Sequence, residues 1–312
     1  MAGTDEETGE KGAGARQGID PAVRGLAAYA RSFRVTLEMI KFSHTLFALP
    51  FALLSAVLAA QGVPALSTLV KILLAMVGAR STAMAHNRLA DREIDAANPR
   101  TASRALPSGA LSVAFVRVFL AASVALFLFA AASLNRLTFL LSPAALALLF
   151  FYAYTKRFTW LSHVALGLCL ALAPLGGWIA VRGSFDWVPI LLALAVLFWT
   201  TGFDMLYALA DEAYDRAVGL NSFPARFGAA RTLVVSAVLH GLMIPMLLGA
   251  WRLSGGGWLF AAGILATAAG LFYQHAIVKP GDLSRLNTAF FTANGFVSAA
   301  LAAFGIADVV VK

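Results

Sequence analysis

Charged side chains are scarce in this chain of 312 residues. Asp, Glu, Lys and Arg make up 13% of it, whereas hydrophobic residues make up 60%. Soluble domains usually contain about a quarter charged residues. The polar side chains are too few to cover a soluble protein of this size. The composition therefore excludes an ordinary soluble domain and predicts that lipid surrounds much of the chain.

Cysteine is almost absent as well. Cys169 is the single cysteine in the sequence, which excludes an internal disulfide framework. It lies within an apolar run, where a free thiol behaves as a small buried hydrophobic residue. We therefore assign it a packing role.

Acidic residues are fewer than basic ones, and the net charge is +8. In a soluble domain this excess would suggest nucleic-acid binding. Here the Lys and Arg residues fall mainly in short segments between apolar runs, as orientation in a membrane predicts. We expect the lipid bilayer to be a partner and nucleic acid not to be one. The sequence gives no sign of an obligate protein partner.

The apolar runs predict an all-α integral membrane protein. About nine runs are long enough to form spanning helices, which need roughly 20 apolar residues each. They lie at 44–61, 66–86, 114–133, 137–154, 162–181, 187–206, 231–250, 257–276 and 288–307. Residues 1–31 are polar and predict a disordered tail, which leaves 32–312 as the membrane domain.

The basic residues predict how the chain is oriented. Lys and Arg mark the cytoplasmic side of a membrane protein. One set of connections carries most of them: Arg88, Arg92, Arg100, Arg104, Lys156, Arg157, Arg216, Arg226, Arg231, Lys279 and Arg285. The other set has only Arg136, Arg182 and Arg252. We expect a multi-pass protein of the inner cell membrane whose N-terminus lies in the cytoplasm.

Three oxygen-bearing side chains follow the second apolar run. Asn87, Asp91 and Asp95 are spaced by four, so a helix places them along one stripe. We call them the first acidic segment. Two carboxylates one turn apart repel each other unless a cation lies between them. Magnesium prefers oxygen ligands and is often held by one or two carboxylates together with substrate phosphates.

The same spacing recurs at Asp211 and Asp215, which we call the second acidic segment. Tyr207 precedes it by one helical turn, and the segment is predicted to lie on the same side of the membrane. Two such segments facing each other could hold metal ions that bridge a diphosphate and neutralise its charge as it leaves. We predict that the two segments meet at the cytoplasmic mouth of one cavity.

Both segments resemble the aspartate-rich motifs of the UbiA superfamily of intramembrane prenyltransferases. The stretch 98–109, the Tyr152-x-x-x-Lys156 element and the stretch 222–228 are also similar to segments of its quinone-pathway members. The resemblance runs from about residue 38 to the end of the chain. It implies a bundle of nine transmembrane helices around a central cavity. Two positions depart from the pattern, because Arg88 and Ala210 stand where many members carry an acid or another polar residue.

The resemblance also assigns roles to residues. Magnesium and diphosphate would be held by Asn87, Asp91, Asp95, Asp211 and Asp215, with further diphosphate contacts from Arg100, Arg104, Lys156 and Arg157. Tyr152 and Tyr207 would line the reaction centre. His44 lies at the start of the first span, where a polar group at membrane depth usually has a role, and it is a candidate for contact with the acceptor.

The implied activity is the Mg²⁺-dependent transfer of a polyprenyl group from its diphosphate to a hydroxylated aromatic acid. The acceptor would be of the 4-hydroxybenzoate type, in ubiquinone or menaquinone biosynthesis, and the active site would face the cytoplasm. A 1,4-dihydroxy-6-naphthoate acceptor is the alternative within this class. A divalent-cation transporter is the alternative outside it, because intramembrane acids often mark ion paths. The accompanying Arg and Lys residues favour a phosphate over a bare cation.

Overall fold

The computed structural model describes residues 34–40, 45–279 and 282–312. The predicted tail at 1–31 and His44 lie outside these residues. Within the described residues the fold is helical, with an isolated bridge between Lys279 and Asp282 as the only β-type pairing. The prediction of an all-α protein is confirmed.

Nine long helices correspond in order to the nine predicted spans within the described ranges. They are α2 (Thr45–Ala60), α3 (Leu66–Ala90), α5 (Val113–Leu134), α6 (Arg136–Thr155), α7 (Ser162–Arg182), α8 (Trp187–Ala208), α11 (Ala229–Leu253), α12 (Trp258–Ile277) and α13 (Asn294–Val311), the last preceded by a π-helical turn (Thr288–Ala293). Eight described segments are long and apolar enough to cross a membrane, and α2 is shorter, with 16 residues.

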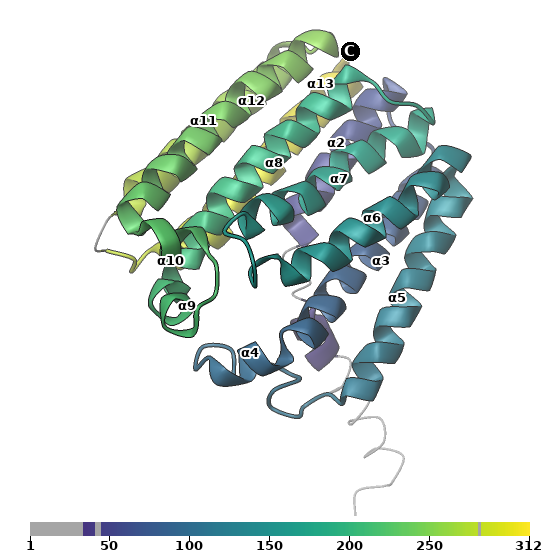
Figure 1. Cartoon of the computed structure of the whole chain (residues 1–312). Helices are drawn as coiled ribbons and strands as arrows, with labels where there is room; N and C mark the ends of the chain where they lie inside the picture. The colour runs from purple at the N-terminus through teal and green to yellow at the C-terminus, as the bar shows by residue number, and fades with distance from the viewer. Residues whose placement is uncertain (1–33, 41–44, 280–281) are drawn as a thin grey trace, which may run out of the picture.

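Helix α8 lies near the centre of the bundle and α5 at its edge (Figure 1). In the most apolar part of the segment that begins with α8, 67% of the residues are buried. In the corresponding part of α5, 17% are buried. Trp199 on α8 is fully buried, and its indole Nε1 donates a hydrogen bond of 2.9 Å to Asn294 Oδ1 on α13. Buried polar groups need such partners, so this bond helps to fix α8 against α13.

Small residues allow two pairs of helices to approach closely. A Cβ atom added at Gly177 on α7 would lie 2.2 Å from the carbonyl oxygen of Ala52 on α2. One added at Gly78 on α3 would lie 2.7 Å from the backbone nitrogen of Phe127 on α5. Side-chain size therefore sets the spacing at both contacts, as is common between membrane helices.

The two ends of the bundle differ in structure. Short helices gather at one end, which we call the polar end: α4 (Arg92–Ala97), the 3₁₀ turn Leu209–Asp211, α9 (Glu212–Val218) and α10 (Phe223–Phe227). The C-terminus lies at the opposite end (Figure 1). There Asp308 accepts hydrogen bonds from the backbone nitrogens of Gly257 (2.7 Å) and Phe260 (3.3 Å), which caps the start of α12.

Candidate active site in the bundle cavity

A cavity of about 1080 Å³ lies within the bundle, lined mainly by α2, α3, α6, α7 and α8. Its lining includes Ile72 on α3 and Asp91 just after the end of that helix. These two residues lie roughly 28 Å apart along the helix axis at 1.5 Å per residue. The cavity therefore extends through much of the bundle. Charged side chains line the polar end, and apolar ones such as Leu134 and Phe185 line the other end.

All five residues of the two acidic segments line this cavity. In the first segment, α3 ends at Ala90 and α4 begins at Arg92. The break at Asp91 is slight, because the backbone N–H groups of Asp91 and Asp95 still donate helical hydrogen bonds to the carbonyl oxygens of Asn87 and Asp91, four residues earlier. The predicted stripe is present: Asn87 Nδ2 donates to Asp91 Oδ2 at 3.1 Å.

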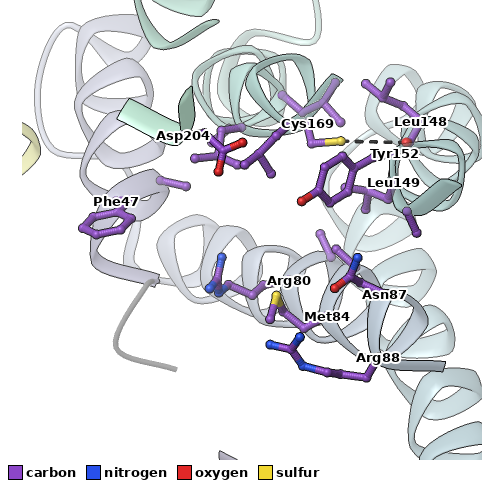
Figure 2. Close-up of a pocket in the computed structure, with 18 of the residues that line it drawn as sticks. Phe47, Arg80, Met84, Asn87, Arg88, Leu148, Leu149, Tyr152, Cys169 and Asp204 are labelled. Atoms are coloured by element: carbon purple, nitrogen blue, oxygen red, sulfur yellow. Dashed lines mark hydrogen bonds between the residues drawn. The ribbon is translucent and has the colours of Figure 1, made fainter. Parts of the chain in front are cut away.

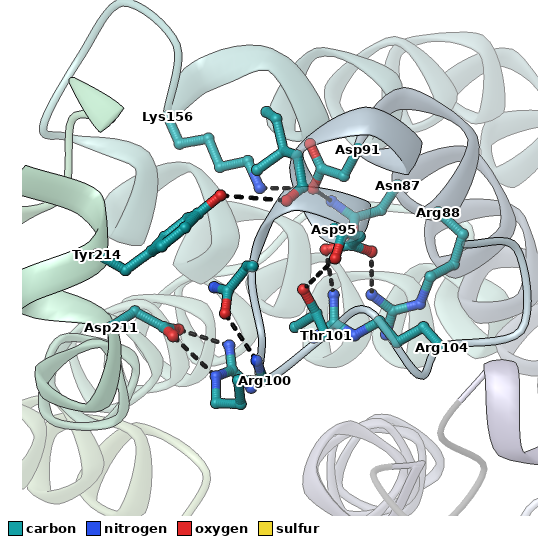
Figure 3. Close-up of polar contacts among 12 residues, drawn as sticks. Asn87, Arg88, Asp91, Asp95, Arg100, Thr101, Arg104, Lys156, Asp211 and Tyr214 are labelled. Atoms are coloured by element: carbon teal, nitrogen blue, oxygen red, sulfur yellow. Dashed lines mark hydrogen bonds and ion pairs between the residues drawn. The ribbon is translucent and has the colours of Figure 1, made fainter. Parts of the chain in front are cut away.

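Basic side chains neutralise the first acidic segment (Figure 3). Lys156 Nζ, at the end of α6, lies 2.6 Å from Asp91 Oδ2. Arg104 lies 2.7 Å from Asp95 Oδ1, and Arg88 lies 3.7 Å from Asp95 Oδ2. The side chains of Asp91 and Asp95 are only 3% and 5% exposed. Buried carboxylates need such partners, since an unpaired buried charge is strongly unfavourable.

The second acidic segment is more open and has fewer ion pairs. Asp211 Oδ1 and Oδ2 accept two hydrogen bonds from Arg100, at 2.7 Å and 2.5 Å. Arg100 follows the first segment in the chain, so its bidentate pair joins the two segments across the polar end (Figure 3). Burial acts to lower the pKa of the Arg100 guanidinium, but the hydrogen bonds and the charge of Asp211 outweigh it and raise that pKa above its usual value.

The acidic segments fit a magnesium ion only if a substrate completes its coordination. Among the described residues, no three His, Cys, Asp or Glu side chains converge closely enough to hold a metal ion. Two buried oxygens of the first segment, Asp91 Oδ1 and Asp95 Oδ2, nevertheless lack a hydrogen-bond partner. Magnesium often takes one or two carboxylates and fills its remaining positions with phosphate oxygens and water. The donor set therefore suits a magnesium–diphosphate complex.

Aromatic rings lie beside the charged side chains at the polar end of the cavity. Tyr207 on α8 stacks on Phe290, with ring centroids 4.1 Å apart, and the Arg100 guanidinium lies 5.9 Å from the Tyr207 ring centroid. Tyr152 on α6 lines the cavity opposite α3, with its hydroxyl directed toward the interior (Figure 2). Aromatic faces can stabilise a cation through the ring quadrupole.

Two predicted site residues, Arg157 and His44, are not among the described residues that line the cavity. Arg157 is absent from the residues that line the cavity, and it contacts Asp91 Oδ1 from the rim at 3.6 Å. It also donates a hydrogen bond to the carbonyl oxygen of Ala90. The prediction for His44 falls on a residue outside the described ranges.

Among the cavity-lining residues that sequence reasoning missed are three ionisable residues within the long helices: Arg80, His163 and Asp204. Each lies inside an apolar run, which is itself a signal, because ionisable residues within membrane helices usually have a role. Arg80 precedes Asn87 by seven residues and Asp204 precedes Asp211 by seven, so each lies roughly 10 Å deeper along its helix.

Comparisons with known proteins agree with this architecture. Residues 48–296 match the model of the UbiA prenyltransferase family. A 4-hydroxybenzoate octaprenyltransferase of Yersinia pseudotuberculosis serotype IB is 33% identical over 222 residues, which cover 71% of this chain and 77% of that protein. The protein of the same name from Salmonella paratyphi B is 32% identical over 236 residues, or 76% of this chain and 81% of that one.

Solved structures of UbiA homologs also resemble this chain. The apo structure of a UbiA homolog from Aeropyrum pernix K1 has a TM-score of 0.78 and 33% sequence identity, and covers 86% of this chain and 98% of its own. A UbiA homolog from Archaeoglobus fulgidus bound to GPP and Mg²⁺ has a TM-score of 0.71 at 23% identity, covering 88% and 99%, and shows the shared fold. The cavity with its two acidic segments and the family match together show that this chain belongs to the UbiA prenyltransferase family.

Proposed function

We propose that this protein transfers a polyprenyl group from its diphosphate to a hydroxylated aromatic acid of the 4-hydroxybenzoate type, as a step in quinone biosynthesis. The observation that carries the proposal is a single cavity with a charged mouth and an apolar interior. A polyprenyl diphosphate has the same division, with one anionic end and a long apolar chain. The relatives named 4-hydroxybenzoate octaprenyltransferase support this acceptor.

The diphosphate would bind at the polar end between the two acidic segments. Asn87, Asp91, Asp95, Asp211 and Asp215 would hold magnesium, which when bound neutralises the charge of the leaving diphosphate. The UbiA homolog structure bound to GPP and Mg²⁺ supports this choice of metal.

Lysine and arginine side chains would contact the diphosphate directly. Lys156, Arg100 and Arg104 line the mouth and already pair with the acidic residues. On donor binding they would contact the phosphate oxygens and stabilise the charge that develops as the allylic C–O bond breaks. This set of cations also argues against a divalent-cation transporter, because it would repel a bare metal ion.

The apolar interior would protect the reaction from water. A prenyl cation formed beside Tyr152 and Tyr207 lies against aromatic rings, which stabilise it by their quadrupole. Exclusion of water prevents its capture as an alcohol. The rest of the chain would lie along the apolar part of the cavity, which residues such as Ile72 and Leu134 line.

Arg80 would bind the carboxylate of the aromatic acid. Its side chain lines the cavity about two helical turns deeper than Asn87 on α3. A planar guanidinium recognises a carboxylate through two parallel hydrogen bonds. With its carboxylate at Arg80, the acceptor ring would lie between the diphosphate end and the apolar interior.

By the distribution of Lys and Arg, the polar end would face the cytoplasm of the inner membrane. A cysteine placed there should react with an impermeant maleimide only in inside-out vesicles. Glu212 on α9 is a suitable position, since its side chain is 24% exposed and pairs only with Arg216 four residues away among the described contacts.

The activity is tested with detergent-purified protein, 4-hydroxybenzoate and octaprenyl diphosphate in the presence of MgCl₂. We expect the prenylated acid by mass spectrometry and loss of product when EDTA is added. Product should return when excess MgCl₂ is restored. Failure to form product with this acceptor while the donor is bound would overturn the proposed acceptor.

A further inference from the structure

A second polar pair lies inside the cavity, away from both acidic segments. His163 on α7 and Asp204 on α8 line the cavity, and His163 Nδ1 lies 2.6 Å from Asp204 Oδ2. The His163 side chain is 5% exposed and that of Asp204 is 23% exposed. The histidine is therefore enclosed by protein, while the carboxylate retains access to the cavity.

The backbone determines which nitrogen of His163 carries hydrogen. The N–H of Phe223, in α10, donates a hydrogen bond of 3.2 Å to His163 Nε2. An amide nitrogen can only donate, so Nε2 supplies a lone pair and Nδ1 carries the hydrogen. Nδ1–H then donates to Asp204 Oδ2, in the way that a buried partner commonly orients a functional side chain.

This arrangement leaves Asp204 as an acceptor with no strong cation beside it. Within the described residues, the ion pairs of Asp204 comprise the contact with His163 and none with Lys or Arg. It thus differs from Asp91, Asp95 and Asp211, which all pair with Lys or Arg. An ionised carboxylate in an apolar cavity is energetically unfavourable unless it has a partner, so such residues usually have a function.

Asp204 lies where an aromatic acceptor would pass. Figure 2 shows Asp204 and Arg80 on facing helices, with the Tyr152 hydroxyl directed toward the space between them. The two charges are opposite in sign and lie at a similar depth, seven residues inside their respective acidic segments. An acceptor with a carboxylate at one end of its ring and a hydroxyl at the other matches this pair of charges.

We propose that Asp204, oriented by His163, binds the hydroxyl of the aromatic acceptor and takes its proton during prenyl transfer. This inference rests on the proposed function and adds to it a residue with a defined chemical role. Asp204 would be a catalytic residue, because it contacts the reacting molecule, and His163 a positioning residue.

During prenyl transfer Asp204 would hold the phenolic proton only temporarily. The allylic C–O bond breaks, and the diphosphate leaves with the electron pair. The ring carbon ortho to the hydroxyl forms the new C–C bond while the phenolic proton passes to Asp204, which gives a neutral dienone. The hydrogen on that ring carbon then leaves as a proton to the diphosphate. Asp204 returns its proton to the oxygen, and the aromatic phenol is restored.

Asp204→Asn tests the proposal, because the amide keeps the size of the side chain and loses its basicity. We expect kcat with saturating 4-hydroxybenzoate to fall by about 100-fold or more, the usual scale of general-base catalysis. Donor KM should change by less than about twofold, since the donor diphosphate binds elsewhere. Asp186→Asn is the matched control: it is an exposed acid that caps the start of the same helix and does not line the cavity.

Acceptors whose hydroxyl groups differ in acidity distinguish the loss of a base from a structural defect in Asp204→Asn. 3-Fluoro- and 2,3-difluoro-4-hydroxybenzoate have more acidic hydroxyls than 4-hydroxybenzoate and keep one ortho position free. If Asp204 takes the proton, the deficit of Asp204→Asn relative to wild type should shrink along this series. A deficit that stays constant along the series, or kcat within about threefold of wild type, would overturn the proposal.

The role of His163 is tested with His163→Asn and His163→Leu. Asparagine places an N–H group near the position of Nδ1, so it can still donate to Asp204, whereas leucine cannot. We expect acceptor KM to rise in both variants and His163→Asn to recover part of the loss, while donor KM stays constant. Equal losses in the two variants would contradict a positioning role.

Two controls keep the outcomes distinct. Gel filtration and binding of octaprenyl diphosphate report whether each variant is folded, and Asp204→Ser, which is polar and also lacks a basic group, replaces Asp204→Asn if the latter misfolds. If wild-type protein binds donor but transfers nothing to any of the three acids, the proposed function fails and this inference fails with it. If wild type transfers and Asp204→Asn transfers equally well, this inference alone fails.

Discussion

The two acidic segments share a spacing but differ in their surroundings. In the first, Asp91 and Asp95 are buried and each pairs with a basic residue from a distant or neighbouring element. In the second, Asp211 is more exposed and pairs with Arg100 alone, while Asp215 forms no ion pair with another described residue. The first segment is thus held in place by its ion pairs, and the second has more freedom to rearrange around the proposed substrate. Variants of the acidic residues and of their basic partners should reveal that difference.

Removal of one acid from each segment should have the largest effect. We expect Asp91→Ala and Asp211→Ala each to lower prenyl transfer by about 100-fold or more, because in the proposed function both would hold the magnesium that neutralises leaving-group charge. The variants should differ in stability. Asp91→Ala leaves Lys156 without its partner and should cost about 3 kcal/mol, whereas Asp211→Ala disrupts a half-exposed pair and should cost less than about 1 kcal/mol.

Thermal unfolding and transfer assays on the same preparations measure both quantities. An equal loss of stability in the two variants would contradict the difference between the segments. Transfer near the wild-type rate at saturating magnesium would contradict the catalytic assignment. Glu93→Ala is the matched control, since its side chain is 91% exposed and lies on α4 between Asp91 and Asp95.

Lys156 should show the next largest effect. It caps the end of α6, one turn after Tyr152, and reaches back to Asp91. We expect Lys156→Ala to raise donor KM by about tenfold and to slow turnover, since charged hydrogen bonds contribute about 1.5–3 kcal/mol. Lys156→Arg should rescue only in part, because a planar guanidinium does not reproduce a compact ammonium group. Unchanged donor kinetics in Lys156→Ala would assign the residue to membrane orientation alone.

Arg100 should have a smaller effect, because its pair with Asp211 is partly exposed. We expect Arg100→Ala to raise donor KM by about two- to fivefold, with little change in thermal stability. Arg92→Ala is the control, since Arg92 lies on α4 and pairs only with the neighbouring Glu93 among the described contacts. A loss of stability as large as that of Asp91→Ala would show that Arg100 joins the two segments structurally and not only through the substrate.

Asp308 should have the smallest effect on activity, because it lies at the opposite end of the bundle. Asp308→Ala removes the cap of α12 and the partner of Lys312, which lies 2.8 Å away. We expect a loss of about 1–2 kcal/mol in stability and an unchanged transfer rate per folded molecule. A reduced rate at full folding would extend the functional region beyond the polar end.

Much of the fold followed from local patterns. The nine predicted runs match nine long helices within the described ranges. Four of these helices contain a proline: Pro50, Pro143, Pro174 and Pro245. Helices in lipid satisfy their own backbone hydrogen bonds, so length and hydropathy are enough to locate them. The arrangement of each acidic segment could also be predicted from the sequence, since a spacing of four residues places side chains on one face of a helix.

The sequence did not predict which residues these side chains contact. Lys156 and Asp91 are 65 residues apart, Arg100 and Asp211 are 111 apart, and His163 and Asp204 are 41 apart. No periodicity within a helix predicts which residues meet across helices. The small residues that permit close approach, such as Gly177, are recognisable in the sequence only once the partner helix is known.

The sequence by itself determined that this chain lies in a membrane, where its helices begin and end within a few residues, and that it carries two acidic segments of equal spacing. These properties depend on hydropathy and on the geometry of one helix. Only the tertiary structure decided that both segments line one cavity, that the first is buried against Lys156 and Arg104, and that Asp204 stands apart beside His163. Such contacts depend on how side chains of different helices pack, and packing is a property of the whole bundle.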